Sequence, residues 1–213
     1  MVDIFDTSYN KDVQVKITDN RIKKGEDVNI TAKDPTMTNI VVGVGWQLNA
    51  FDTDTLDLDV SCFLLDKDGK TRKDDDFVFY NNLEGCDGAI VHNGDNLTGA
   101  GDGDDETISI ALNNLPYDVL NVMFVLSIYR GEEKDQGMGS VRKGYLRVLN
   151  ASNSQELLRY EISADVEESK ETAFLVASLN REGPKWHFGA VGVLCEGGLA
   201  KVATDYGMIV HTG

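Results

Sequence analysis

The chain has little positive charge. Its 20 Lys and Arg residues stand against 36 Asp and Glu residues, so the formal net charge is −16 at pH 7. Phosphate backbones and anionic membrane surfaces bind proteins mainly through Lys and Arg. The composition therefore predicts that nucleic acid is not a partner, and it disfavours electrostatic attachment to a membrane.

Cysteine is also scarce. Cys62, Cys86 and Cys195 form an odd set without the spacing of a metal site. Because Cys62 and Cys195 lie in apolar runs, we expect reduced structural thiols and therefore a reducing, cytoplasmic compartment.

Long apolar runs are missing. The first six residues offer neither a basic region nor an apolar one, and the longest run, Val119 to Tyr129, is interrupted by Asn121 and Ser127. Such a run is too short to span a bilayer. We expect a soluble protein without direct membrane insertion.

Short alternating segments dominate what is present. Alternation of apolar and polar residues is typical of strands with one buried face. Residues 1–12 lack any period and are expected to form a weakly ordered lead-in, and residues 13–213 a single domain. The fold class predicted is mainly β: a β-sandwich of two antiparallel-rich sheets with a short C-terminal helix over 198–206. The expected strands are 13–18, 28–31, 40–46, 56–66, 76–80, 107–112, 119–130, 144–149, 156–162, 172–180 and 185–195.

Two glycines stand in the expected strand over 40–46. Gly43 and Gly45 lack the third glycine and the following helix of a dinucleotide-binding fingerprint. Glycine inside a strand more often marks close packing or a bulge, which is the interpretation we favour.

The stretch from Gly94 to Glu106 concentrates negative charge. Its glycines permit positive φ, and no Lys or Arg lies among its acids, which are Asp95, Asp102, Asp104, Asp105 and Glu106. Carboxylates about 4 Å apart repel by roughly 4 kcal/mol at an intermediate dielectric, so a folded loop of this kind needs full solvation or a cation. Calcium, with about 6–8 oxygen ligands in irregular geometry, suits the loop better than magnesium. Zinc does not, because the loop offers no His or Cys.

A second acidic patch lies in the strand expected over 56–66. Asp57 and Asp59 alternate with Leu58 and Val60, so the two carboxylates are expected to point the same way. Together with the loop they suggest one site built from a rigid strand and a flexible segment. A merely solvated acidic turn remains the alternative. His92 stands alone beside the acids and is expected to make a surface hydrogen bond rather than a metal bond.

Several motifs in order carry a resemblance to a known family. From about Val13 to Val210 the chain resembles the TerD family of tellurium-resistance and stress-response proteins, on the segments Gly43–Trp46, Asp57–Leu65, Asp76–Asn82, His92–Gly99, Gly101–Glu106 and Trp186–Phe188. The resemblance implies a β-sandwich that binds calcium, as two ions, in a cytoplasmic setting and without enzymatic activity. It also implies that the partners are other proteins of a stress-response system, with self-association left open.

The same resemblance implies a ligand set. The side chains carried over are Asp57, Asp59, Asn82, Asp95, Asn96, Asp104 and Glu106, followed by Asp102 and Asp105, with carbonyl groups from Gly101 and Gly103. Two positions depart from the family pattern, which usually has Asp where this chain has Gln47 and Phe near the position of Met138. Neither departure removes an expected ligand, but both put in doubt which partner the chain recognises.

Two other functions stay open. Asp57, Asp59 and Glu106 could serve as the paired carboxylates of a hydrolase, although so many neighbouring acids and amides are more typical of ligands. Alternatively, the acidic face could act as a scaffold for a basic partner without any metal.

Overall fold

The computed structural model describes residues 20–47, 56–94 and 103–210. Within this part, seven strands form sheet A, in the order β1-β11-β10-β3-β8-β7-β6. All neighbours are antiparallel except β1 and β11, which are parallel. Their bounds are β1 Arg21–Ile22, β11 Glu156–Glu161, β10 Arg142–Asn150, β3 Asn39–Gln47, β8 Glu106–Ala111, β7 Ile90–His92 and β6 Glu84–Gly85.

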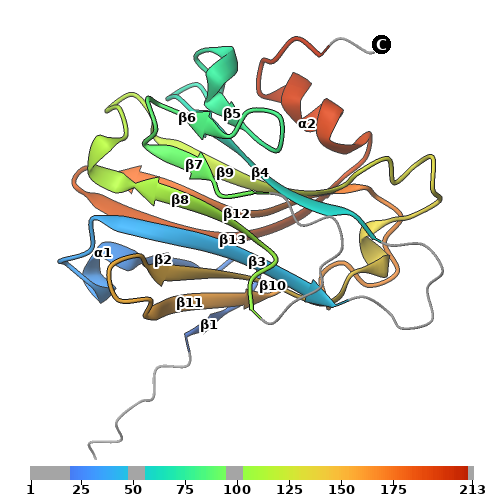
Figure 1. Cartoon of the computed structure of the whole chain (residues 1–213), viewed down its shortest axis with the longest axis horizontal. Coiled ribbons are helices and arrows are strands. Elements are labelled where there is room, and N and C mark those ends of the chain that lie inside the picture. The colour runs from blue at the N-terminus through green and yellow to red at the C-terminus, as the bar shows by residue number, and fades with distance from the viewer. Residues whose placement is uncertain (1–19, 48–55, 95–102, 211–213) are drawn as a thin grey trace, which may run out of the picture.

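The second layer is sheet B, whose described strands follow the order β2-β13-β12-β9-β4-β5 and are all antiparallel (Figure 1). Their bounds are β2 Asp27–Asn29, β13 Lys185–Cys195, β12 Ala173–Glu182, β9 Asn121–Ile128, β4 Leu58–Leu65 and β5 Phe77–Val78. β9 lies between β12 and β4, so this long apolar strand occupies the middle of the sheet. The predicted mainly-β sandwich of two antiparallel-rich sheets is confirmed.

The main core fills the space between the two sheets. Alternate residues of the longer strands point into it, and Val42 in β3 and Val60 in β4, for example, are at most 1% exposed. Phe124 and Phe188 contact each other at its centre, with ring centroids 5.8 Å apart. The free thiols of Cys62 and Cys86 are buried, and that of Cys195 is partly exposed.

Helix α2 (Gly198–Asp205) covers the outer face of sheet B and confirms the predicted C-terminal helix. Val202 and Ala203 pack on a second apolar cluster that includes Phe63 of β4. The Thr71 amide donates to the carbonyl group of Tyr206 at 2.9 Å, which fastens the end of α2 to the chain after β4. Figure 1 shows α2 beside β4 and β5, on the opposite side of the molecule from β11.

Three local predictions were incomplete. The strand expected over 28–31 ends at Asn29, because the Asn29 side chain accepts from the Ala32 amide at 2.8 Å and starts helix α1 (Ile30–Lys33). A second helix was not predicted. The strand expected over 76–80 shrinks to β5, preceded by the 3₁₀ helix η2 (Asp74–Asp76). Further 3₁₀ turns are η3 (Leu112–Asn114) and η4 (Met138–Ser140).

Asp76 explains the shortened strand. Its carboxylate binds the Arg72 guanidinium with two hydrogen bonds from Nε and Nη2, at 2.9 and 2.7 Å, and it also accepts from the Arg72 amide at 2.8 Å. These contacts hold residues 72–76 in a turn rather than in a strand. The strand expected over 13–18 and the lead-in over 1–12 lie outside the described residues.

Replacing Phe124 by Ala tests the main core. The side chain is fully buried, so the loss of its ring should lower the free energy of unfolding by about 3–5 kcal/mol. Urea unfolding would measure this difference. Tyr117→Ala, at a side chain 93% exposed, should change it by no more than about 0.5 kcal/mol. Similar losses for both variants would contradict the assignment of the core.

Candidate metal site

Glu106 and His92 join the two sheets at one corner. β4 pairs with β9 along its whole length but with β5 only at Cys62 and Phe63. At Val60 the place of a neighbouring strand is taken by two side chains of sheet A. The Glu106 carboxylate accepts from the Val60 amide at 2.6 Å, and His92 Nε2 lies 3.0 Å from the Val60 carbonyl oxygen. These contacts satisfy backbone groups that would otherwise be buried without partners.

This corner brings the two predicted acidic segments together. Asp59 is adjacent in sequence to Val60, which Glu106 contacts, and both carboxylates are buried, at 5% and 2% exposure. Asp59 lies opposite Ser127 of β9 and lines a cavity of about 310 Å³ on the outer face of sheet B. Asp57 is half-buried just before β4, and its carbonyl oxygen accepts from the Tyr129 amide at 2.9 Å.

The two ends of the acidic loop also meet here. Gly94 follows β7 with φ 126°, and Gly103 precedes β8 with φ 113°, so both positions need glycine, as predicted. The Gly94 amide donates to His92 Nδ1 at 3.3 Å, which links the start of the loop to the corner. The remaining predicted ligands of the loop lie outside the described residues: Asp95, Asn96, Gly101 and Asp102.

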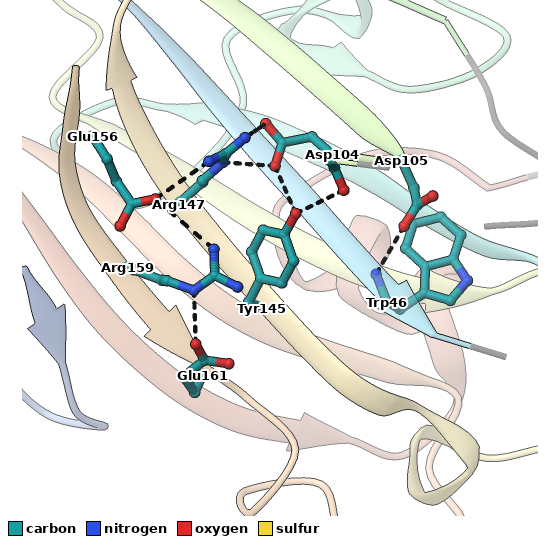
Figure 2. Close-up of polar contacts among 9 residues, drawn as sticks. Trp46, Asp104, Asp105, Tyr145, Arg147, Glu156, Arg159 and Glu161 are labelled. Atoms are coloured by element: carbon teal, nitrogen blue, oxygen red, sulfur yellow. Dashed lines mark hydrogen bonds and ion pairs between the residues drawn. The ribbon is translucent and has the colours of Figure 1, made fainter. Parts of the chain in front are cut away.

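Asp104 turns to the outer face of sheet A (Figure 2). Arg147 Nε and Nη2 donate to its two oxygens at 2.8 and 3.1 Å, and the Tyr145 hydroxyl donates to it at 3.0 Å. Burial and the charge of Asp104 raise the pKa of Tyr145 to about 12, so this hydroxyl keeps its proton at neutral pH. Asp104 therefore already has a cation and a donor from β10.

Asp105 and Asn82 have backbone partners. Asp105 Oδ2 accepts from the Trp46 amide at 2.8 Å. Burial raises the pKa of the Asp105 carboxyl, the Trp46 hydrogen bond opposes that rise, and the charge of Asp104 adds to it. The Asn82 side-chain amide donates to the carbonyl oxygen of Phe77 at 2.6 Å, and the Asn82 backbone closes a tight turn with Phe79.

The acids near this corner face different ways, because Asp59 lines the cavity outside sheet B and Glu106 points into the sandwich. Asp57, Asp59, Asp105 and Glu106 offer only oxygen, which calcium prefers. Burying several carboxylates side by side is costly unless a cation or hydrogen bonds compensate. Among residues 20–47, 56–94 and 103–210, no three His, Cys, Asp or Glu side chains are arranged to hold a metal ion by themselves. A complete coordination shell would need donors from beyond these residues, and the predicted ligand set stays a prediction.

Three contributors were not foreseen. His92 is 2% exposed and bonds to β4, so the expectation of a surface hydrogen bond was wrong. The sequence near the loop does not indicate Tyr145 and Arg147, because they lie about 40 residues beyond it. Gly43 gave the one usable signal. A Cβ atom there would lie 2.1 Å from an Asp104 oxygen, so the predicted close packing at this glycine is confirmed, with Asp104 as its neighbour.

Replacing Glu106 by Leu tests how much the hydrogen bond to the Val60 amide of β4 stabilises the protein. The Val60 amide would lose its acceptor, so in metal-free buffer Glu106→Leu should be less stable than Glu106→Gln, which keeps an oxygen, by about 1–3 kcal/mol. Chemical denaturation of both variants measures the difference. Equal stabilities would show that the Val60 amide does not depend on this acceptor.

A double-mutant cycle on Asp104→Ala and Arg147→Ala tests the ion pair that fastens the end of the acidic loop to β10. Their side chains are 8% and 25% exposed and make two hydrogen bonds, so a coupling energy of about 1–3 kcal/mol is expected. The exposed pair Lys67 and Asp68 is the control and should couple by at most about 0.5 kcal/mol. If the two substitutions changed the free energy of unfolding additively, the Asp104–Arg147 ion pair would not stabilise the protein.

Comparison with known proteins extends the resemblance noted from the motifs. The TerD domain matches residues 19–206 of the chain. General stress protein 16U of Bacillus subtilis (strain 168) is 43% identical over 190 residues, covering 89% of this chain and 97% of that protein. Tellurium resistance protein TerD of Alcaligenes sp is 43% identical over 187 residues, covering 88% and 96%. These relatives are named for stress or resistance rather than for a reaction.

The fold has a solved counterpart as well. The crystal structure of a homologue of telluride resistance protein TerD from Streptomyces coelicolor A3(2) superimposes with a TM-score of 0.64 at 19% identity, covering 78% of this chain and 95% of that one. In the part of the chain that the structure describes, no helix has the length and apolar character needed to cross a membrane. From the domain match and the two relatives, it follows that the chain belongs to the TerD family of tellurium-resistance and stress-response proteins.

Proposed function

We propose that the chain is a calcium-binding, non-enzymatic module of a cytoplasmic stress response, in which calcium ties β4 to the acidic loop. The observation that carries this proposal is the contact between Glu106 and the Val60 amide, because it places the loop end against the strand that bears Asp59. Two acidic segments far apart in sequence thereby share one corner of the sandwich.

Residues of this chain would hold the ion through carboxylate and carbonyl oxygens. Asp57 and Asp59 supply a rigid side from β4, and Asp105 and Glu106 supply a second side from the start of β8. Asp95, Asn96, Asp102 and the carbonyl groups of Gly101 and Gly103 are the proposed remainder, enough for two ions. Bound calcium would neutralise carboxylates that otherwise repel each other by roughly 4 kcal/mol per pair at about 4 Å.

Among the described members of the proposed shell, Gly103, Asp104 and Asn82 fit less well than Asp57, Asp59 and Glu106. The Gly103 carbonyl oxygen already accepts from the Tyr145 hydroxyl at 2.8 Å. The Asp104 carboxylate would have to leave Arg147 in order to reach an ion on the other side of β3. The Asn82 side-chain nitrogen is committed to the Phe77 carbonyl, so only its oxygen could serve. We therefore place the strongest ligands at Asp57, Asp59 and Glu106.

The contacts of Glu106 also argue against a paired-carboxylate hydrolase. A general acid needs a free proton site facing the scissile bond, whereas Glu106 Oε2 is bonded to the backbone of β4 and lies 3.7 Å from His92. The partners we propose are other proteins of the stress-response system, with association between copies of the chain as an alternative. Loss of binding in added salt would identify a purely acidic scaffold.

Calcium should raise the thermal stability of the purified protein. A ligand at about 100 times its dissociation constant adds roughly 2.7 kcal/mol to the free energy of unfolding. Metal analysis and melting curves in calcium, in magnesium and in a chelator measure this effect. Asp59→Asn should weaken calcium binding at least about tenfold, whereas Asp68→Asn, at a side chain 64% exposed in a surface turn, should not.

The magnitude of the affinity decides the role of the ion. Dissociation constants below about 10⁻⁷ M would indicate a structural ion, and values of about 10⁻⁷–10⁻⁵ M would indicate a sensor. A protein that carries no metal through purification, and whose melting curve a chelator leaves unmoved, would contradict the proposal.

A further inference from the structure

A hollow of about 650 Å³ opens on the outer face of sheet A, away from the corner at Val60. Its volume lies within the range of about 300–1,000 Å³ that is usual for small-molecule sites. Neither described α-helix covers this face, since α2 packs on sheet B and α1 contacts β13. The side chains that line it come mainly from β3, β10 and β11 and from the segment that follows β11.

Gly45 of β3 leaves the space in which the Tyr145 ring packs beside the hollow. A Cβ atom at this position would lie 2.5 Å from the Tyr145 ring, so only glycine lets the ring lie flat against β3. The Tyr145 hydroxyl shares its one proton between the Gly103 carbonyl oxygen at 2.8 Å and the Asp104 carboxylate at 3.0 Å. The ring is therefore fixed at both ends by packing and hydrogen bonding.

Arg159 is held above this ring. Its guanidinium carbon lies 3.5 Å from the Tyr145 ring centroid, and its Nε donates to Glu161 at 2.7 Å (Figure 2). The nearest acid to its Nη1 is Glu156 at 3.8 Å, which is beyond hydrogen-bond distance. The Nη1 and Nη2 groups of Arg159 are therefore held in a fixed orientation before any ligand binds, and they still have N–H groups that can donate to a ligand.

Lys143 adds a second cation. It is exposed, its φ of 46° is unusual for a residue with a side chain, and it lies where the register between β10 and β3 shifts. Among the described residues it makes no ion pair within 4.0 Å. Nearby, Ser163 accepts from the Gly144 amide at 2.9 Å, which leaves the Ser163 hydroxyl proton to donate.

We propose that this hollow binds the oxyanion group of a small molecule, either a phosphate or a carboxylate, through Lys143, Arg159 and Ser163. Cations with spare donors are unexpected on a chain of net charge −16, and here two of them line one preformed hollow. Stacking on Tyr145 gives Arg159 the fixed planar fork that matches oxyanions. Glu161 and Glu156 offset part of the Arg159 charge, so the site relies on the N–H donors that remain at the Nη end of Arg159 and on Lys143.

The site does not need calcium, so it can be tested without it. Chelator-treated, ¹⁵N-labelled protein would be titrated with pyrophosphate, with citrate and with a short oligoglutamate peptide, at matched ionic strength. We expect saturable shifts of the Lys143, Tyr145 and Ser163 amide signals with pyrophosphate or with citrate. The stronger of the two anions identifies the group as phosphate or carboxylate.

Variants separate a built site from general surface charge. Lys143→Ala and Arg159→Gln should each weaken binding at least about tenfold, the effect of losing one charged hydrogen bond. Lys185→Ala removes another exposed lysine, at the start of β13, and should leave affinity unchanged. Melting curves would confirm that each variant is folded.

Two results would overturn the inference. The first is a shift that stays linear with anion concentration or is the same in Lys143→Ala, Arg159→Gln and Lys185→Ala. The second is saturable binding of the oligoglutamate peptide alone, which would make the hollow a protein-docking surface instead. Anion titrations are made in chelator and calcium titrations without anion, so the proposed function can fail while this site stands, and the reverse.

Discussion

The hydrogen bond from the Val60 amide to Glu106 is the contact on which the rest of the site depends. Strand edges present unpaired backbone groups, and natural sheets cover them. Here β5 pairs with β4 only at Cys62 and Phe63, so it leaves the edge of β4 before Cys62 uncovered. At Val60, side chains of the opposite sheet cover this edge instead. The same carboxylate therefore closes the sandwich and positions the end of the acidic loop beside Asp59.

Two acids of this loop, two residues apart, point in different directions. Asp104 lies over Gly43 on the outer face of sheet A, where Arg147 neutralises it, whereas Glu106 points into the sandwich toward β4. The loop end is thus fastened on both faces of one sheet. Tyr145 takes part in the outer attachment and also lines the hollow of sheet A, so the end of the acidic loop and the proposed oxyanion site share this residue.

Much of the fold follows from local patterns. The bounds of β13 match the prediction, and the alternation around Asp59 correctly indicated the strand β4. The expectation of a single buried face was wrong, because α2 and its apolar cluster also bury the outer face of β4. The partners of Asp104 could not be predicted in this way. Gly43 predicted that another group packs closely against β3. Nothing near Gly43 in sequence indicates Arg147, since strand order in a sandwich is set by non-local packing. Short-range side-chain bonds at Asn29 and Asp76 likewise overrode strand patterns.

Helix α2 has a role beyond completing the fold. It lies over Phe63, whose ring stacks on Phe77 with centroids 4.3 Å apart and also contacts Tyr206 at 5.1 Å. A shortened chain that stops before Gly198 would leave this aromatic surface uncovered next to the short edge strand β5. Such a surface favours association between molecules, so shortened forms of the protein would be aggregation-prone even with both sheets intact.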